Sequence, residues 1–182
     1  KSEIFNYIDN VEEEYSKSED KEVLFKSYWN QHDLFNANDY SLLQRSENAL
    51  GKYYEDGQVV KKDYEEAVKW YKRAARKIFF RDNIFNYSYS VNPEAQFNLG
   101  IMYSSGLGVE QDYVKGLMWL LFSKYSTQTS EGLESTRDAI EKLKQIMSSE
   151  QIETANELFN KWFARDYGYQ VGNKLINYPT IG

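Results

Sequence analysis

The chain of 182 residues contains no cysteine and a single histidine. These absences exclude disulfide frameworks, thiol nucleophiles, thiolate zinc sites and metal sites built from several histidines. The 2 prolines stand beside 16 tyrosines, 10 phenylalanines and 4 tryptophans, whereas disordered and fibrous chains carry few aromatic side chains. We therefore expect a folded chain, forming one compact or one elongated unit, with no cofactor and no metal.

The chain also lacks an excess of positive charge and lacks long hydrophobic runs. Its 22 Lys and Arg against 28 Asp and Glu give a net charge of −6. A sequence-independent grip on nucleic acid needs many cations to neutralise phosphates, so we expect no nucleic-acid partner. No window approaches the roughly 18 apolar residues of a membrane-spanning helix, so we expect no membrane span.

The sequence does contain an internal repeat. A shift of 49 positions superimposes Gly51 on Gly100 and carries the surrounding pattern with it. Glycine, tyrosine and tryptophan recurring together indicate two copies of one supersecondary unit. The other matched pairs are Leu50 with Leu99, Tyr54 with Tyr103, Gly57 with Gly106, Val60 with Val109, Asp63 with Asp112, Tyr64 with Tyr113 and Trp70 with Trp119.

Each copy is typical of a helical hairpin. In copy two, Asn92 and Pro93 favour a helix start, Gly106 favours its end, and Asp112 is a suitable N-cap for the next helix. In copy one, Asp63 is the corresponding N-cap. The second helix of copy one is then expected to bury one face, made of Tyr64, Ala67, Val68, Tyr71, Ala74 and Ala75.

Copy two also resembles a known repeat. Its pattern Ala95-x-x-x-Leu99-Gly100-x-x-Tyr103-x-x-Gly106-x-Gly108-Val109-x-x-Asp112-x-x-Lys115-x-x-x-Trp119 is similar to the Sel1-like repeat, a relative of the tetratricopeptide repeat. Copy one fits with Val59 in place of the second loop glycine, and copy two departs later at Gly116, Leu120 and Ser123. The resemblance implies an all-α fold, an α-α superhelix in which the repeats form a right-handed solenoid with helical caps.

The remaining segments are assigned around these repeats. Ser148 and Gln151 form a capping box that opens a helix carrying Ala155 and Trp162. The expected order is an N-terminal helical cap or degenerate repeat (1–38), repeat 1 (39–76), an aromatic-rich insert (77–91), repeat 2 (92–124), a C-terminal helix pair (134–166) and an extended tail (167–182).

The insert has two interpretations. Either the second helix of copy one runs longer and its aromatic rings pack against the next repeat, which is the favoured interpretation, or the insert is an exposed aromatic loop that contacts a partner. The candidate contact residues are Phe79, Phe80, Phe85, Tyr87 and Tyr89.

No catalytic residue is identified. His32 lies at helical spacing with Tyr28 and Phe35, which favours a structural role. The basic stripe that includes Arg73 and Arg76 is interpreted as a solvated helix face, with an acidic partner's docking site as the alternative.

Stacked helical hairpins expose a concave surface, so the sequence predicts a non-enzymatic module that binds another protein. Residues offset from the expected core side of the first helices are Lys52, Tyr53, Asp56, Asn98, Ile101, Met102 and Ser105.

The resemblance also implies two alternatives: an immunity protein that binds and neutralises a secreted bacterial toxin, and a weak hydrolase like the cysteine-rich β-lactamase-like relatives. The hydrolase is disfavoured because this chain has no cysteine and no Ser-x-x-Lys motif. Because the sequence begins at Lys1, we expect that an N-terminal segment was removed. The resemblance also implies export, because many Sel1-like repeat proteins are exported. Together these two grounds favour a periplasmic or secreted bacterial location over a cytoplasmic one.

Overall fold

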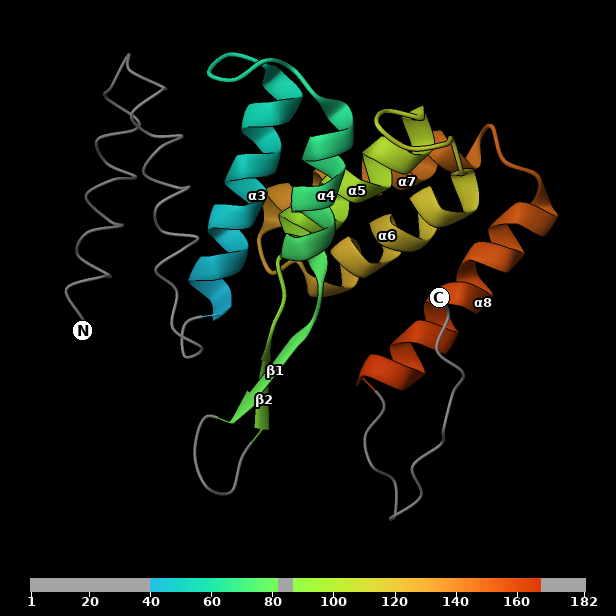
Figure 1. Cartoon of the computed structure of the whole chain (residues 1–182). Coiled ribbons are helices and arrows are strands. Elements are labelled where there is room, and N and C mark those ends of the chain that lie inside the picture. The colour runs from blue at the N-terminus through green and yellow to red at the C-terminus, as the bar shows by residue number, and fades with distance from the viewer. Residues whose placement is uncertain (1–39, 82–86, 168–182) are drawn as a thin grey trace. The chain divides into compact units, whose positions relative to one another are not determined.

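The computed structural model describes residues 40–81 and 87–167, which group into two compact units (Figure 1). The first unit ends at Asn92 and the second begins at Pro93. Chain length predicted one compact or one elongated unit, and the structure divides the chain into two units with one repeat in each. The predicted cap at 1–38, His32 and the tail from 168 onward lie outside the described residues. Within the described ranges, no helix combines the length and hydrophobicity needed to cross a membrane.

The first unit contains the helical hairpin of copy one. Helix α3 (Tyr40–Asp56) packs against α4 (Tyr64–Ala75). The predicted N-cap is confirmed, since the side chain of Asp63 accepts a hydrogen bond from Glu66 N at 3.0 Å. The loop between the helices turns at Gly57, whose φ of +67° is the left-handed conformation that glycine tolerates best. The predicted core face of α4 is buried at Ala67, Val68, Tyr71, Ala74 and Ala75, whereas Tyr64 is half-buried.

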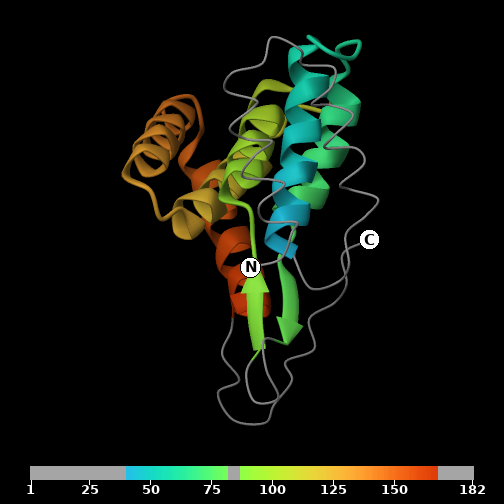
Figure 2. The same cartoon turned by 90° about the vertical axis from the view of Figure 1, so that its left-hand side faces the viewer.

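The insert folds as a β-hairpin. Strand β1 (Ile78–Arg81) pairs antiparallel with β2 (Tyr87–Ser90), and Phe79 lies opposite Tyr89. The favoured expectation that α4 continues into the insert is therefore wrong, because α4 ends at Ala75 and Arg76 is already extended. The alternating Tyr-Ser-Tyr-Ser of β2 is the strand signal that the sequence interpretation missed. The hairpin leaves the helix pair at the end opposite the loop that joins α3 to α4 (Figure 2).

The second unit begins with the hairpin of copy two. Helix α5 (Pro93–Ser105) starts at the predicted proline and packs against α6 (Tyr113–Ser126). The predicted N-cap of α6 is confirmed, since Asp112 accepts a hydrogen bond from Lys115 N at 2.9 Å. Gly106 and Gly108 take φ of +69° in the loop, where copy one uses left-handed backbone only at Gly57.

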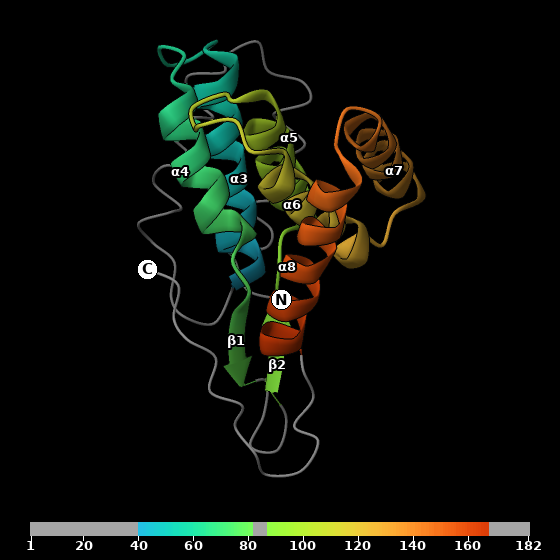
Figure 3. The same cartoon turned by 90° about the vertical axis from the view of Figure 1, so that its right-hand side faces the viewer.

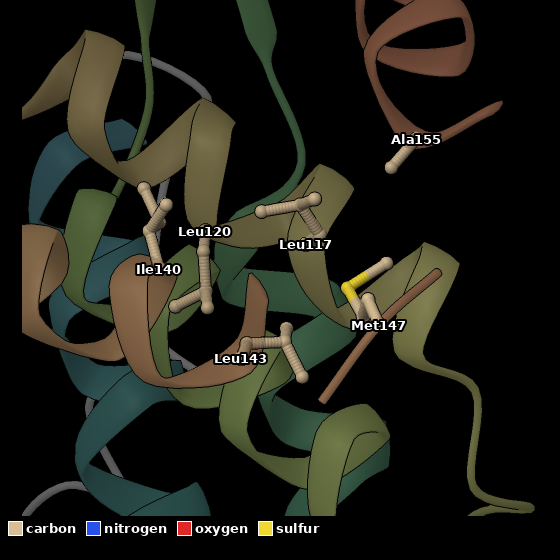
Figure 4. Close-up of a cluster of buried hydrophobic side chains, with 6 residues drawn as sticks. All are labelled: Leu117, Leu120, Ile140, Leu143, Met147 and Ala155. Carbon is tan, nitrogen blue, oxygen red and sulfur yellow. The ribbon is translucent and has the colours of Figure 1, made fainter. Parts of the chain in front are cut away.

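Helices α7 (Ser130–Lys144) and α8 (Ser149–Tyr167) complete the second unit, and α6 contacts both (Figure 3). The Ser148–Gln151 capping box is confirmed by two reciprocal hydrogen bonds of 2.9 and 3.2 Å. Helix α7 starts before residue 134 because Thr129 caps it. A buried cluster from these helices forms the core of the unit (Figure 4): Leu117, Leu120, Ile140, Leu143, Met147 and Ala155.

Candidate protein-binding surfaces

The face predicted from helix geometry is only partly exposed. Lys52, Asp56 and Ser105 are exposed, and Asn98 is half-buried. Ile101 is also half-buried and packs against the core cluster of the second unit.

Two residues of that predicted face are buried, so the expectation that they are exposed is wrong. Tyr53 is 6% exposed and Met102 is 1% exposed. Each lies three positions after a core leucine, Leu50 or Leu99, and residues three apart lie on the same side of a helix. Neither side chain is therefore available as a contact on a free surface.

The candidates in the insert lie on the hairpin. Phe79 and Phe80 belong to β1, and Tyr87 and Tyr89 belong to β2. Phe85 falls outside the described residues. The assignment of these five residues to partner binding stays a prediction.

Two arginines from the basic face of α4 form ion pairs with a buried carboxylate. Glu47 on α3 is fully buried, and its Oε1 lies 3.0 Å from Arg73 Nε and 3.6 Å from Arg76 Nη2. Arg73 also lies over the ring of Trp70, with its guanidinium carbon 4.8 Å from the ring centroid. Two cations of the predicted stripe therefore help to join α4 to α3, a role that the charge pattern alone did not indicate.

A buried glutamine anchors the base of the β-hairpin. The Gln44 side chain on α3 donates from Nε2 to the Arg76 carbonyl and accepts from Ser90 Oγ at 2.6 Å. Its backbone carbonyl accepts a hydrogen bond from Asn92 Nδ2 at 3.3 Å. One fully buried residue thus contacts the chain on each side of the hairpin. No local pattern in the sequence indicates this arrangement, because the partners are 32 to 48 positions away.

Helices α6 and α8 carry a continuous row of aromatic rings, named here the aromatic strip. Tyr125 packs edge-on against Phe163, with ring centroids 4.6 Å apart and an interplanar angle of 83°. Phe159 joins Phe163 to Phe122 at centroid distances of 5.5 and 4.8 Å. Trp119 completes the row at 5.9 Å from Phe122.

Exposure increases from Phe122, inside the aromatic strip, to Tyr125 at one of its ends. Phe122 is buried, Trp119, Phe159 and Phe163 are half-buried, and Tyr125 is 54% exposed. Sequence reasoning missed this surface, although the three-residue spacing of the α6 aromatics placed them on one helix face. The strip can provide a large apolar contact area of rigid side chains, with a phenolic hydroxyl at its exposed end.

The bend between α5 and α6 has a distinct electrostatic arrangement. Lys115 Nζ lies 3.0 Å from Asp112 Oδ2 and 5.7 Å from the centroid of the Tyr103 ring. Burial alone would raise the pKa of Asp112, but hydrogen bonds from Lys115 and its positive charge outweigh burial, so the pKa lies below its ordinary value. The same carboxylate raises the pKa of Lys115 through a side-chain hydrogen bond and charge attraction.

Two small concavities lie on the surface of the described part of the chain. One of about 320 Å³ lies at this bend and is lined by residues that include Tyr103 and Lys115. Another of about 360 Å³ lies along α8 beside Glu153 and Glu157. Among the residues that the structure describes, no group of three or more His, Cys, Asp or Glu side chains is arranged to hold a metal ion.

Comparison with known structures shows the fold. A protective antigen of uropathogenic Escherichia coli strains, described as displaying an SLR fold, aligns with a TM-score of 0.55 at 18% identity. The alignment covers 92% of this chain and 36% of that chain. A Sel1 repeat protein from Oxalobacter formigenes aligns with a TM-score of 0.38 at 22% identity, covering 81% of this chain and 64% of that one. The chain thus spans about a third of the first protein and under two thirds of the second.

Sequence comparison identifies the repeats themselves. No curated protein matches the sequence. The family model for the Sel1 repeat matches residues 44–77, which contain α4 and most of α3, and residues 93–123, which contain α5 and most of α6. The two matches coincide with the two copies found by internal comparison, and the structural likeness agrees with them. The chain therefore contains two Sel1 repeats, one in each of its two compact units.

Proposed function

We propose that this chain is a non-enzymatic module that binds another protein, and that the aromatic strip is its main contact surface. Sel1 repeats are generally protein-interaction modules without catalytic activity. The observation that carries the proposal is the exposed end of the strip, where Tyr125 is 54% exposed and packs edge-on against Phe163.

The strip has the physical properties of a binding hot spot. Aromatic side chains are enriched where proteins bind one another, because they bury much area at a small cost in conformational entropy. The packing of Tyr125 on Phe163 restrains the ring before a partner arrives, which reduces that cost further. The exposed side chains of Lys124, Asn160 and Lys161 lie within two positions of strip residues in the sequence and supply polar groups for its margin.

The first helices of the two copies, on which the sequence predicted contact residues, contribute in a reduced form, each within its own unit. We assign contacts there to Lys52, Asp56, Asn98 and Ser105, and not to Tyr53 or Met102, which are buried. Such polar side chains suit the margin of an interface and are expected to contribute little individually.

The test compares Tyr125→Glu with Ile146→Glu, a matched control. Tyr125 and Ile146 are the large hydrophobic side chains classed as exposed in the described residues, and Ile146 lies outside the strip. A partner is captured from the native host, identified by mass spectrometry and purified, and its affinity for each variant is measured by calorimetry. We expect Tyr125→Glu to raise the Kd by at least about tenfold and Ile146→Glu to change it by less than about twofold. Equal effects of the two substitutions would reject the strip as the contact surface.

The identity of the captured partner also distinguishes a general interaction module from an immunity protein. If the captured partner is a secreted toxin, the role is that of an immunity protein, and growth protection on co-expression is the further requirement. Turnover of nitrocefin above background by the pure chain would contradict the non-enzymatic part of the proposal.

A further inference from the structure

The basic face of α4 consists of four cationic side chains. They stand at i, i+3, i+4 and i+7, a spacing that places them on one side of the helix. The first three belong to α4 and the fourth is its C-cap. All four are exposed: Lys69, Lys72, Arg73 and Arg76.

Ion pairs with Glu47 position two of these cations and leave positive charge at the surface. The Glu47 carboxylate is fully buried and is shared by Arg73 and Arg76, so one negative charge faces two positive ones. The side chains of Arg73 and Arg76 stay 45% and 48% exposed. Arg73 is also held over the Trp70 ring. The guanidinium groups are thus restrained before a ligand binds, which lowers the entropy cost of pairing with a further anion.

The two lysines continue the positive charge along the same face. Lys69 Nζ pairs with Glu66 Oε2 at 2.7 Å, and its side chain stays 67% exposed. Lys72 lies almost one turn further along the helix and is exposed. The acidic residues of α4, Glu65 and Glu66, lie in its first turn, and residues 67–81 contain no aspartate or glutamate. The later turns of the helix therefore carry positive charge alone.

The distribution of charge selects the kind of anion that fits this face. Residues 61–77 contain 7 Lys and Arg against 3 Asp and Glu, in a chain whose net charge is −6. The basic face is short, because residues 69–76 span only about 10 Å of helix. A nucleic-acid backbone carries closely and evenly spaced charges, so it would also meet the carboxylates of Glu65 and Glu66. An acidic polypeptide can place its carboxylates opposite the four cations and nowhere else.

We propose that the basic face of α4 docks an acidic segment of a partner protein, whose carboxylates pair with the two lysines and the two arginines. Guanidinium groups donate paired hydrogen bonds to carboxylates, and the lysine ammonium groups add charge attraction. Exposed ion pairs are individually weak and are screened by salt, so this contact serves mainly to steer and orient the partner. The face shares no residue with the aromatic strip, so the inference stands whatever Tyr125→Glu does to partner binding.

The probe is a short synthetic peptide with four glutamates at i, i+3, i+4 and i+7 in an alanine background. A control peptide carries glutamine in their place. Each is titrated into the isotope-labelled full chain at about 0.1 M salt, while amide chemical shifts are recorded. We expect the glutamate peptide to cause saturable shifts centred on residues 69–76 with a Kd below about 1 mM. The glutamine peptide should cause no saturable shift.

Two charge reversals in the first unit separate docking on this face from general attraction between charges. Lys72→Glu alters the face, and Lys61→Glu makes the same change of charge at an exposed position in the loop before α4. The rise from Tyr64, where the helix begins, to Lys72 is about 12 Å, which exceeds the Debye length of about 10 Å. We expect Lys72→Glu to raise the Kd at least about fivefold and Lys61→Glu to change it less than about twofold.

A second variant and folding controls complete the test. Lys72→Gln removes the charge without reversing it and should raise the Kd at least about twofold. Circular dichroism and urea unfolding measure whether each variant keeps its fold. Shifts centred outside residues 69–76, equal effects of the two reversals, or an equal response to the glutamine peptide would each overturn the proposal. Tighter binding of a single-stranded oligonucleotide of equal charge would overturn it as well.

Discussion

At the scale of single residues, the two helices of each copy pack closely at the same position, but different side chains form the contact. In copy one, a Cβ on Gly51 would approach the Tyr71 ring to 2.5 Å, so the ring lies directly on the glycine. The Tyr71 hydroxyl then donates a hydrogen bond to Glu55 Oε2. This pair links α4 to α3.

Copy two replaces both members of this pair together. Leu120 and Ser104 stand at the positions of Tyr71 and Glu55. The Ser104 hydroxyl donates to the Gly100 carbonyl of its own helix at 2.6 Å. It also occupies the space that a Cβ at Gly116 would need, which explains why glycine stands there in place of the alanine of copy one.

This packing predicts a penalty for Gly116→Ala. In an exposed helix position, that change would gain up to about 1 kcal/mol of helix propensity. Here the new methyl group would collide with Ser104 Oγ and press on the Gly100 carbonyl, so we expect a net loss of about 1–3 kcal/mol in the free energy of unfolding. Urea denaturation measures it.

The double variant Ser104→Ala, Gly116→Ala serves as the control. Removing the hydroxyl relieves the nearest contact and should recover part of the loss. Stability of the single variant equal to or above that of the natural chain would refute this account of Gly116.

At the scale of the element, short polar side chains determine where the helices begin. Asp63 and Asp112 occupy the same position in the two copies, and each accepts a hydrogen bond from the backbone N–H three residues later. Lys115 adds an ion pair with Asp112 at 3.0 Å. The helix start of copy two therefore depends on a charged carboxylate.

The lowered pKa of Asp112 predicts a pH dependence of stability. A carboxyl whose pKa is lower in the folded chain than in the unfolded chain stabilises the fold fully above its unfolded pKa, about 3.9, and loses that contribution as pH falls through its folded pKa. Asp112→Asn keeps an N-cap acceptor but removes the charge. We expect the stability difference between the natural chain and this variant to be present at pH 7 and to shrink below about pH 4.

Urea midpoints measured from pH 7 to pH 3 test this dependence. Asp112→Ala also removes the acceptor. This variant should lower the free energy of unfolding by about 1 kcal/mol across the whole pH range. A difference for Asp112→Asn that grows toward acid pH would contradict the assigned direction of the shift.

At the scale of the whole molecule, a few long-range polar contacts determine how the first unit is assembled. Gln44 contacts segments 32, 46 and 48 residues away. Glu47, one helical turn later, pairs with Arg73 on α4. The polar side of α3 is thus an internal contact surface that positions both α4 and the hairpin.

Loss of the Gln44 anchor should loosen the hairpin. Gln44→Leu removes the side-chain bonds to the Arg76 carbonyl and Ser90 Oγ, so we expect a loss of about 1–3 kcal/mol in the free energy of unfolding. Amide hydrogen exchange in residues 87–90 should be faster than in the natural chain. Gln128→Leu, at an exposed position, is the control. Unchanged exchange at β2 would show that Gln44 does not hold the hairpin.

The sequence predictions were accurate where a structure depends on interactions between residues close in the sequence, and inaccurate where it depends on distant residues. The starts of α4, α6 and α8 were predicted because Asp63, Asp112 and Ser148 act within three residues of themselves. The hairpin was not predicted, since its aromatic residues are compatible with a helix or a strand and the choice depends on what anchors its ends. The prediction that Tyr53 and Met102 are exposed was wrong because α3 and α5 each bury more than one narrow stripe of side chains.

The sequence by itself determined the type of repeat, the two helical hairpins and most of their boundaries, because glycine, proline and capping side chains act locally and recur at the same spacing in both copies. The tertiary structure alone decided the hairpin and its anchor, the internal use of the basic face of α4, and the partial exposure of the aromatic strip. These features depend on side chains brought together from distant positions, and burial is a property of the packed chain that no single segment carries.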